Sequence, residues 1–134
     1  MRTLDEHRSL VEEHIGRLAL AGELAGLTDA MRYALQGGGK RIRPVLCLAT
    51  GEAAGAEPEE LLPAAAAIEL VHTFSLVHDD LPALDDDALR RGRASAHVEY
   101  GEAVAILAGD ALLAQALDLA LSYGRPDVAR EKAV

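Results

Sequence analysis

The sequence has 134 residues, which is enough for one domain with a hydrophobic core. Half of the residues are hydrophobic, but the aromatic ones are only three Tyr and one Phe, and helix formers dominate, so the expected fold class is all-α. The net charge of −9 argues against nucleic acid as a partner, because a phosphate backbone attracts basic surfaces.

The cysteine content and the N-terminal residues favour a cytoplasmic protein. Cys47 is the single cysteine and cannot form an internal disulfide, which fits a reducing compartment. Residues 1–20 carry acidic side chains among the apolar positions, so they do not resemble a signal peptide. Uncharged runs such as Leu61–Ile68 are too short to cross a bilayer, and we expect no membrane span.

Spacing and capping signals predict the first two helices. Across residues 5–20, apolar residues recur at intervals of three and four, which is typical of an amphipathic helix. Thr28 and Asp29 are candidate N-caps for a short second helix that runs through Leu35.

The middle of the chain predicts two further helices. The stretch QGGGKRIRP, residues 36–44, ends the second helix, and Pro44 suits the first turn of a third helix that reaches about Ala54. After a loop, a long fourth helix is expected from near Pro58 to Asp80.

The last third of the chain is expected to contain a loop, a helix and the start of another element. We predict the frayed end of the long helix and a loop for residues 81–95, LPALDDDALRRGRAS. Residues 101–122 are predicted to be strongly helical. The tail YGRPDVAREKAV, residues 123–134, begins another element and then stops. We find no interdomain linker, so residues 1–134 are expected to belong to one helical domain that is incomplete.

An aspartate cluster at the end of the long helix is the main candidate site. On a helix, His72, Ser75 and Asp79 lie near one face because steps of three and four residues nearly complete a turn. Asp80 sits beside them, and Asp85 follows a proline at which the chain can bend back, so the pattern is D-D-x-x-x-x-D. Carboxylates this close repel one another unless a cation lies among them. Mg²⁺ typically binds one or two carboxylates together with substrate phosphates.

The cluster has two other possible interpretations, a solvated loop and a calcium site. A solvated acidic loop that caps a helix would need no ligand, and this alternative stays open for the aspartates alone. A calcium-binding EF-hand requires Asp or Asn at its fifth position and Gly at its sixth. Counted from Asp85, the fifth position is Leu89 and the sixth is not Gly, so the EF-hand reading fails.

Basic residues are concentrated in two places in this acidic chain. Gly37–Gly39 allow close backbone approach, and basic side chains follow at Lys40, Arg41 and Arg43. This is no Walker A motif, which requires Ser or Thr after its Lys. Arg90 and Arg91 follow the aspartates. Either basic element alone is more typical of a solvated surface, but together with the aspartates they predict a diphosphate site.

Three motifs in order resemble the trans-prenyltransferases, the isoprenyl diphosphate synthases. They are GGGKRIRP (37–44), HDDLPALDDDALRRG (78–92), which is similar to the family's first aspartate-rich motif, and YGEAVAILAGDALL (100–113). The resemblance implies an isoprenoid synthase-type helical bundle. It also implies condensation of isopentenyl diphosphate with an allylic diphosphate, Mg²⁺ as cofactor and a homodimer.

The resemblance also implies roles for individual residues. Asp79, Asp80 and Asp85 would be the catalytic and metal-binding aspartates: Asp79 and Asp85 would ligate Mg²⁺ on the allylic diphosphate, and Asp80 would support them. Arg90 would contact the same diphosphate. Isopentenyl diphosphate would be bound by four basic residues: Lys40, Arg43, His72 and Arg91. His97 matches a family histidine, although the sequence ASAH, residues 94–97, departs from the family's usual PTSH or PTCH. Asp110 is expected to have a structural role.

Family members carry a second aspartate-rich motif on a later helix, and nothing after Asp110 resembles it. The resemblance therefore implies that the chain is the N-terminal half of such a domain and that it is incomplete for catalysis. A class I terpene cyclase would share the aspartates but would not need Lys40, Arg43 and Arg91. A non-catalytic partner subunit or structural remnant is the other alternative.

Phe74 and Ser75 are candidate chain-length residues. Phe74 lies five residues before Asp79 on the same predicted helix, which puts its side chain ~7.5 Å below the metal ligands at ~1.5 Å per residue. An aromatic ring there would stop the growing product, as in the bacterial farnesyl-type synthases that the motif resembles, so a C15 product is favoured over C20. The alternative is that Phe74 is an ordinary core residue.

Overall fold

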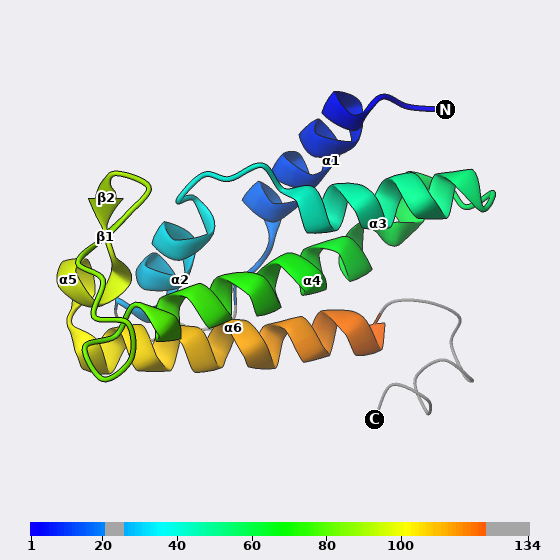
Figure 1. The fold of residues 1–134 in the computed structure, drawn as a ribbon. Helices are drawn as coiled ribbons and strands as arrows, with labels where there is room; N and C mark the ends of the chain where they lie inside the picture. The colour runs from blue at the N-terminus through cyan, green and yellow to red at the C-terminus, as the bar shows by residue number, and fades with distance from the viewer. Residues whose placement is uncertain (21–25, 123–134) are drawn as a thin grey trace. The chain divides into compact units, whose positions relative to one another are not determined.

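The computed structural model describes residues 1–20 and 26–122, in which nearly all regular structure is helical (Figure 1). The elements in chain order are α1 (Leu4–Arg17), α2 (Leu27–Leu35), α3 (Ile42–Ala53), α4 (Pro58–Asp79), β1 (Leu89–Arg90), β2 (Arg93–Ala94), α5 (Ala96–Tyr100) and α6 (Glu102–Ser122). The all-α fold class is confirmed. The predicted element in the tail, residues 123–134, lies outside the described residues.

The chain forms two compact units, each of which is described by itself. Unit 1 contains Met1–Leu18, Lys40–Glu69 and the described residues from Ala116 on. Unit 2 contains Ala19–Gly39 and Leu70–Gln115. The helices α4 and α6 each contribute residues to both units.

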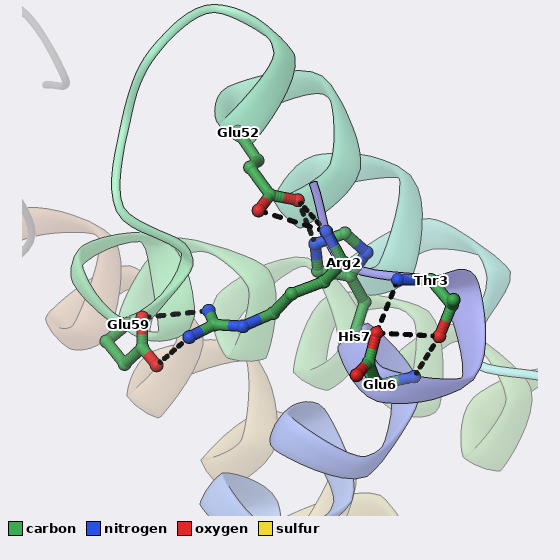
Figure 2. Close-up of polar contacts among 6 residues, drawn as sticks. All are labelled: Arg2, Thr3, Glu6, His7, Glu52 and Glu59. Atoms are coloured by element: carbon green, nitrogen blue, oxygen red, sulfur yellow. Dashed lines mark hydrogen bonds and ion pairs between the residues drawn. The ribbon is translucent and has the colours of Figure 1, made fainter.

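A capping box starts α1 at Leu4 (Figure 2). Thr3 Oγ1 accepts a hydrogen bond from Glu6 N–H over 3.2 Å, and Glu6 Oε2 accepts one from Thr3 N–H over 2.7 Å. The bonds from Thr3 lower the pKa of the Glu6 carboxyl, since they favour its ionised form. The amphipathic helix predicted for residues 5–20 is confirmed, but it ends at Arg17.

Charged contacts tie the N-terminus to α3 and α4 within unit 1 (Figure 2). Arg2 N–H donates to Glu52 Oε2 over 3.0 Å, and the Arg2 guanidinium binds both oxygens of Glu59 over 2.7 and 3.0 Å. The fully buried His7 places Nε2 3.0 Å from Glu52 Oε2, at an ion-pair distance but without hydrogen-bond geometry. These contacts hold α1 against α3.

The starts of α2 and α3 use left-handed residues instead of side-chain caps. Gly26 has a φ of 84° and is the N-cap of α2, so the prediction that Thr28 or Asp29 caps this helix is wrong. Both residues lie in the first turn, where the negative charge of Asp29 interacts favourably with the positive end of the helix dipole. Arg41, with a φ of 50°, is the N-cap of α3, and Pro44 lies in the first turn as predicted.

Small and aliphatic side chains form the core of each unit. In unit 2, a cluster of buried residues joins the end of α4 to α5 and α6: Val77, Leu81, Ala96 and Ala105. In unit 1, the side chains of Val11 and Ile15 from α1 and Leu48 from α3 are buried. The many buried alanines explain how a chain with few aromatic residues builds a helical core, because small residues let helices approach closely.

Among the described residues, α4 and α6 are long and apolar enough to cross a membrane by length and composition alone. A core helix of a soluble protein passes the same test. α4 also buries Glu69, which pairs with Arg41 from another part of unit 1. The absence of a membrane span stays a prediction.

Candidate functional site

The chain folds back directly after α4. Asp85 N–H donates to the carbonyl oxygen of Asp79 over 2.8 Å, and Asp87 N–H donates to that of Asp80 over 3.1 Å. Asp86 has a φ of 53°, in the left-handed region that Asp tolerates better than most residues. The bend predicted from the D-D-x-x-x-x-D spacing is confirmed, because Asp85 lies beside the end of α4.

The carboxylates of the cluster differ in exposure and in partners. Asp79 and Asp85 are exposed, whereas the Asp80 side chain is only 3% exposed. Arg90 donates to both oxygens of Asp80, from Nε to Oδ2 over 2.7 Å and from Nη2 to Oδ1 over 2.6 Å. The bond to Asp80 raises the pKa of the Arg90 guanidinium, because it favours the charged form. Asp80 thus orients Arg90, a pairing that the sequence did not reveal.

The donor set suits a hard cation that also binds phosphate. Across residues 1–20 and 26–122, no three His, Cys, Asp or Glu side chains lie close enough together to hold a metal ion by themselves. Mg²⁺ keeps several waters and needs only one or two protein carboxylates when phosphate oxygens complete its shell. The exposed oxygens of Asp79 and Asp85 meet that requirement, so the predicted role of these two residues is compatible with the structure.

Arg90 and Arg91 lie on a hairpin that the sequence analysis missed. β1 pairs antiparallel with β2, with Leu89 opposite Ala94 and Arg90 opposite Arg93. The turn residues Arg91 and Gly92 have φ values of 51° and 76°, as in the primed turns that favour two-residue hairpins. The stretch predicted as loop therefore includes a short ordered ribbon that presents both arginines.

The Arg91 guanidinium lies against the glycine turn that follows α2. A Cβ built on Gly39 would be 2.5 Å from Arg91 Nη1 and 3.1 Å from Cζ, and Gly39 has a φ of 145°. Only a residue without a side chain allows this approach without displacing the guanidinium. The glycine element and the second arginine, both singled out in the sequence, are thus brought together within unit 2.

His78 fixes the end of α4 against α6. Its Nε2 lies 3.0 Å from the carbonyl oxygen of Ile106 and 3.8 Å from Asp110 Oδ1. Gly109 provides the space for the imidazole, since a Cβ at Gly109 would collide with the ring. The contact with Ile106 positions the helix end that carries Asp79, and the structural role of Asp110 stays a prediction.

The other predicted residues of α4 are half-buried and make local contacts. The Ser75 hydroxyl donates to the carbonyl oxygen of His72 over 2.7 Å, a back-bond common for Ser in helices. The Phe74 ring contacts His78 edge-on, with centroids 4.7 Å apart and an interplanar angle of 71°. The chain-length roles of Phe74 and Ser75 stay predictions.

His97 lies at the start of α5, beside the departure from the family pattern. Its Nδ1 is 3.1 Å from the hydroxyl oxygen of the buried Ser95, the N-cap residue of α5. The contact orients the imidazole locally.

The three basic residues after the glycine turn have different environments. Lys40 and Arg43 are exposed and belong to unit 1, whereas the other predicted site residues belong to unit 2. Arg41 is buried and donates to Glu12 over 2.8 Å and to Glu69 over 2.7 Å. Burial lowers the pKa of Arg41, but the two hydrogen bonds outweigh it and the net shift is upward. Arg41 therefore does not add to the exposed basic charge, contrary to the sequence interpretation.

An open groove of about 390 Å³ runs along α1 in unit 1 and is lined by Arg2, Asp5, Glu6, Ser9, Leu10 and Glu13. None of these is a predicted site residue.

Comparison with known proteins assigns the family. Residues 25–132 match the family model of polyprenyl synthetase, which covers most of the chain, so the chain belongs to the polyprenyl synthetase family. The matched region includes all three motifs on which the resemblance to isoprenyl diphosphate synthases rests.

Individual relatives agree in sequence and in fold. The chain is 51% identical over 115 residues to a geranylgeranyl diphosphate synthase of Cyanophora paradoxa, covering 86% of this chain and 38% of that protein. It is 52% identical over 118 residues to a farnesyl diphosphate synthase of Geobacillus stearothermophilus, covering 87% of this chain and 39% of that protein. The structure matches an isoprenoid synthase family member of Thermotoga neapolitana with a TM-score of 0.86 at 41% identity, covering 96% of this chain and 50% of that one. The chain thus spans less than two-fifths of these two curated relatives.

Proposed function

We propose that this chain supplies the allylic diphosphate site and the basic isopentenyl diphosphate contacts of a short-chain prenyltransferase. The observation that carries the proposal is the fold-back at the end of α4. It places Asp85 beside Asp79 through a 2.8 Å backbone bond, while Asp80 holds Arg90. The condensation would join isopentenyl diphosphate to dimethylallyl or geranyl diphosphate.

The exposed carboxylates and the oriented arginine have complementary tasks in this proposal. Asp79 and Asp85 would hold Mg²⁺, which when bound stabilises the negative charge that develops on a leaving diphosphate. Arg90 uses Nε and Nη2 for Asp80, so Nη1 lies outside that pair and would be the atom that contacts a diphosphate oxygen. A guanidinium already held in place loses little entropy when it binds, which favours stabilisation of the transition state.

The basic residues favour condensation over cyclisation. A terpene cyclase binds one diphosphate, for which the aspartates and Arg90 suffice. Arg91 lies at the glycine turn within unit 2, and Lys40 and Arg43 are exposed residues of unit 1, so the chain carries cations in addition to Arg90. Support also comes from the relatives, whose names are those of farnesyl and geranylgeranyl diphosphate synthases.

Calorimetry with geranyl diphosphate tests the proposal. We expect binding in the presence of Mg²⁺ to be at least ~10-fold tighter than in EDTA, because the cation bridges carboxylates and phosphate. Asp79→Asn and Asp85→Asn should each remove most of the Mg²⁺ dependence.

The matched control is Asp87→Asn, which makes the same charge change in the same exposed loop. It should keep the dependence, since the contact that fixes Asp87 is its backbone N–H. Equal binding in Mg²⁺ and EDTA, or equal loss in all three variants, would contradict the proposed site.

For a protein that completes the condensation, we propose Phe74 as the floor of the product pocket, with Ser75 beside it. Support comes from its position five residues before Asp79 on α4 and from the ring contact that holds it against His78. Phe74→Ala should shift products from C15 toward C20 or longer, read by chromatography of the dephosphorylated alcohols. An unchanged product distribution would remove Phe74 from this role.

Self-association also belongs to the proposal. Ile106 and Leu107 on α6 are 42% and 56% exposed, and apolar surface of this kind favours burial in an interface. A molar mass from light scattering that stays monomeric at high protein concentration would contradict it.

A further inference from the structure

The β1–β2 hairpin, which carries Arg90 and Arg91, is too short to be stable by itself. Only two residue pairs, Leu89 with Ala94 and Arg90 with Arg93, form its ladder. An isolated two-stranded hairpin is at best marginally stable in water. Arg91, at the turn, also adopts a left-handed φ of 51°, which costs energy for a residue with a side chain. Contacts from outside the hairpin must therefore fix its orientation.

Tyr33 of α2 supplies contacts to both residues of β2. Its hydroxyl donates to the carbonyl oxygen of Ala94 over 2.7 Å, and the guanidinium carbon of Arg93 lies 4.2 Å from the centroid of its ring. Tyr100 supports the ring edge-on, with centroids 5.4 Å apart and an interplanar angle of 72°. One half-buried side chain thus joins a hydrogen bond, a cation–π contact and an aromatic pair.

The pair of Arg90 with Asp80 also holds the hairpin, and the helix that carries Tyr33 leads into a further contact. α2 ends at Leu35, and the glycine turn that follows it brings Gly39 against the Arg91 guanidinium. Tyr33 therefore fixes the strand, and the turn behind Tyr33 receives the arginine at its tip. All of these residues belong to unit 2.

We propose that Tyr33 is a positioning residue for diphosphate binding. Through Ala94 and Arg93 it sets the hairpin so that Arg91 stays at the glycine turn, ready to bind the diphosphate of isopentenyl diphosphate. The proposal rests on the proposed function, which gives Arg91 that ligand. Tyr33 is thereby added to the residues that determine diphosphate binding, although it carries no charge and is not expected to contact the ligand. Its partner Ala94 lies 61 positions away in the sequence.

Tyr33→Phe isolates the hydrogen bond, because it keeps the ring that Arg93 and Tyr100 contact. Calorimetric titration with isopentenyl diphosphate should show a ~3- to 10-fold loss of affinity, the effect of one lost hydrogen bond. Helical circular dichroism should be unchanged. Tyr100→Phe is the matched control, since it removes a hydroxyl and keeps the supporting ring, and it should bind like the wild type.

A double variant separates positioning from general stability. If Tyr33 acts through Arg91, Tyr33→Phe should cost less than ~2-fold when Arg91→Ala is already present. Fully additive losses, or unchanged affinity in Tyr33→Phe, would overturn the inference while leaving the proposed function intact. A wild-type chain that binds neither isopentenyl nor geranyl diphosphate would overturn the inference together with the proposed function.

Discussion

Arg41→Ala is expected to lower the free energy of unfolding by about 3–5 kcal/mol, the cost of leaving a buried charge without its counter-ion. The Arg41 side chain is 4% exposed and that of Glu69 is 7% exposed, with 2.7 Å between Nη1 and Oε1. In the variant, the Glu69 carboxylate stays buried and loses this cation. Urea unfolding followed by circular dichroism at 222 nm measures the effect.

Two further variants make the Arg41 test specific. Arg43→Ala removes an exposed arginine two residues away and should change stability by no more than about 0.5 kcal/mol. Arg41→Met combined with Glu69→Leu should recover more than half of the loss, because apolar residues of similar size can replace a buried ion pair. A loss in Arg41→Ala no larger than that in Arg43→Ala would show that the buried network does not stabilise the fold.

The second large effect is expected for Arg90→Ala, with a loss of about 2–4 kcal/mol in stability. The Asp80 side chain is 3% exposed and would lose its bidentate partner, whereas Arg90 itself is 33% exposed, which moderates the loss. Arg91→Ala is the matched control. Arg91 is exposed and should leave stability within about 0.5 kcal/mol of the wild type, although it lowers diphosphate affinity.

The Arg90 contribution should not depend on pH in the neutral range. Its folded pKa is raised above the unfolded value by the hydrogen bond to Asp80, so the stabilisation is fully present below the unfolded pKa. It is lost only as the pH rises through the folded pKa, far above neutrality. The difference in stability between wild type and Arg90→Ala should therefore be the same at pH 6.5 and pH 8.5, and a steep change between these values would point to another titrating group.

Arg90→Lys tests whether the fork geometry matters in addition to the charge. A lysine keeps the positive charge but cannot bind both oxygens of Asp80 in the planar arrangement that Arg90 adopts. We expect it to restore part of the stability lost in Arg90→Ala and little of the affinity for geranyl diphosphate. Full recovery of both would show that charge alone suffices at this position.

Local patterns predicted α1, α2, α3, α4 and α6 and the bend at the aspartate motif, but not the short helix α5. The three- and four-residue spacing around Val11 and Ile15, the glycines after α2 and Pro44 in α3 are signals that lie within one turn of the feature they predict. The D-D-x-x-x-x-D spacing likewise indicated that Asp85 returns to Asp79, because both belong to one short segment. These features were predictable from the sequence because their causes are local.

The failures come from contacts between distant residues and from very short elements. Arg41 meets Glu69 across 28 positions, so nothing near Arg41 separates a buried ion pair from a phosphate ligand. The hairpin has strands of two residues, too short to show alternation, and its turn is Arg-Gly instead of the usual Asn-Gly or Asp-Gly. The role of Tyr33 was not predicted because its hydrogen-bond partner, Ala94, lies 61 positions away in the sequence.

The phosphorus spectrum of geranyl diphosphate bound in the presence of Mn²⁺ tests the central claim most directly. A paramagnetic ion held by Asp79 and Asp85 against the diphosphate should broaden both ³¹P signals beyond the effect of free Mn²⁺. Asp79→Asn combined with Asp85→Asn should reduce the broadening to the level seen without protein, and Asp87→Asn should leave it unchanged. Broadening that is the same in the wild type and in the double variant would contradict the claim that this aspartate turn binds a metal–diphosphate complex.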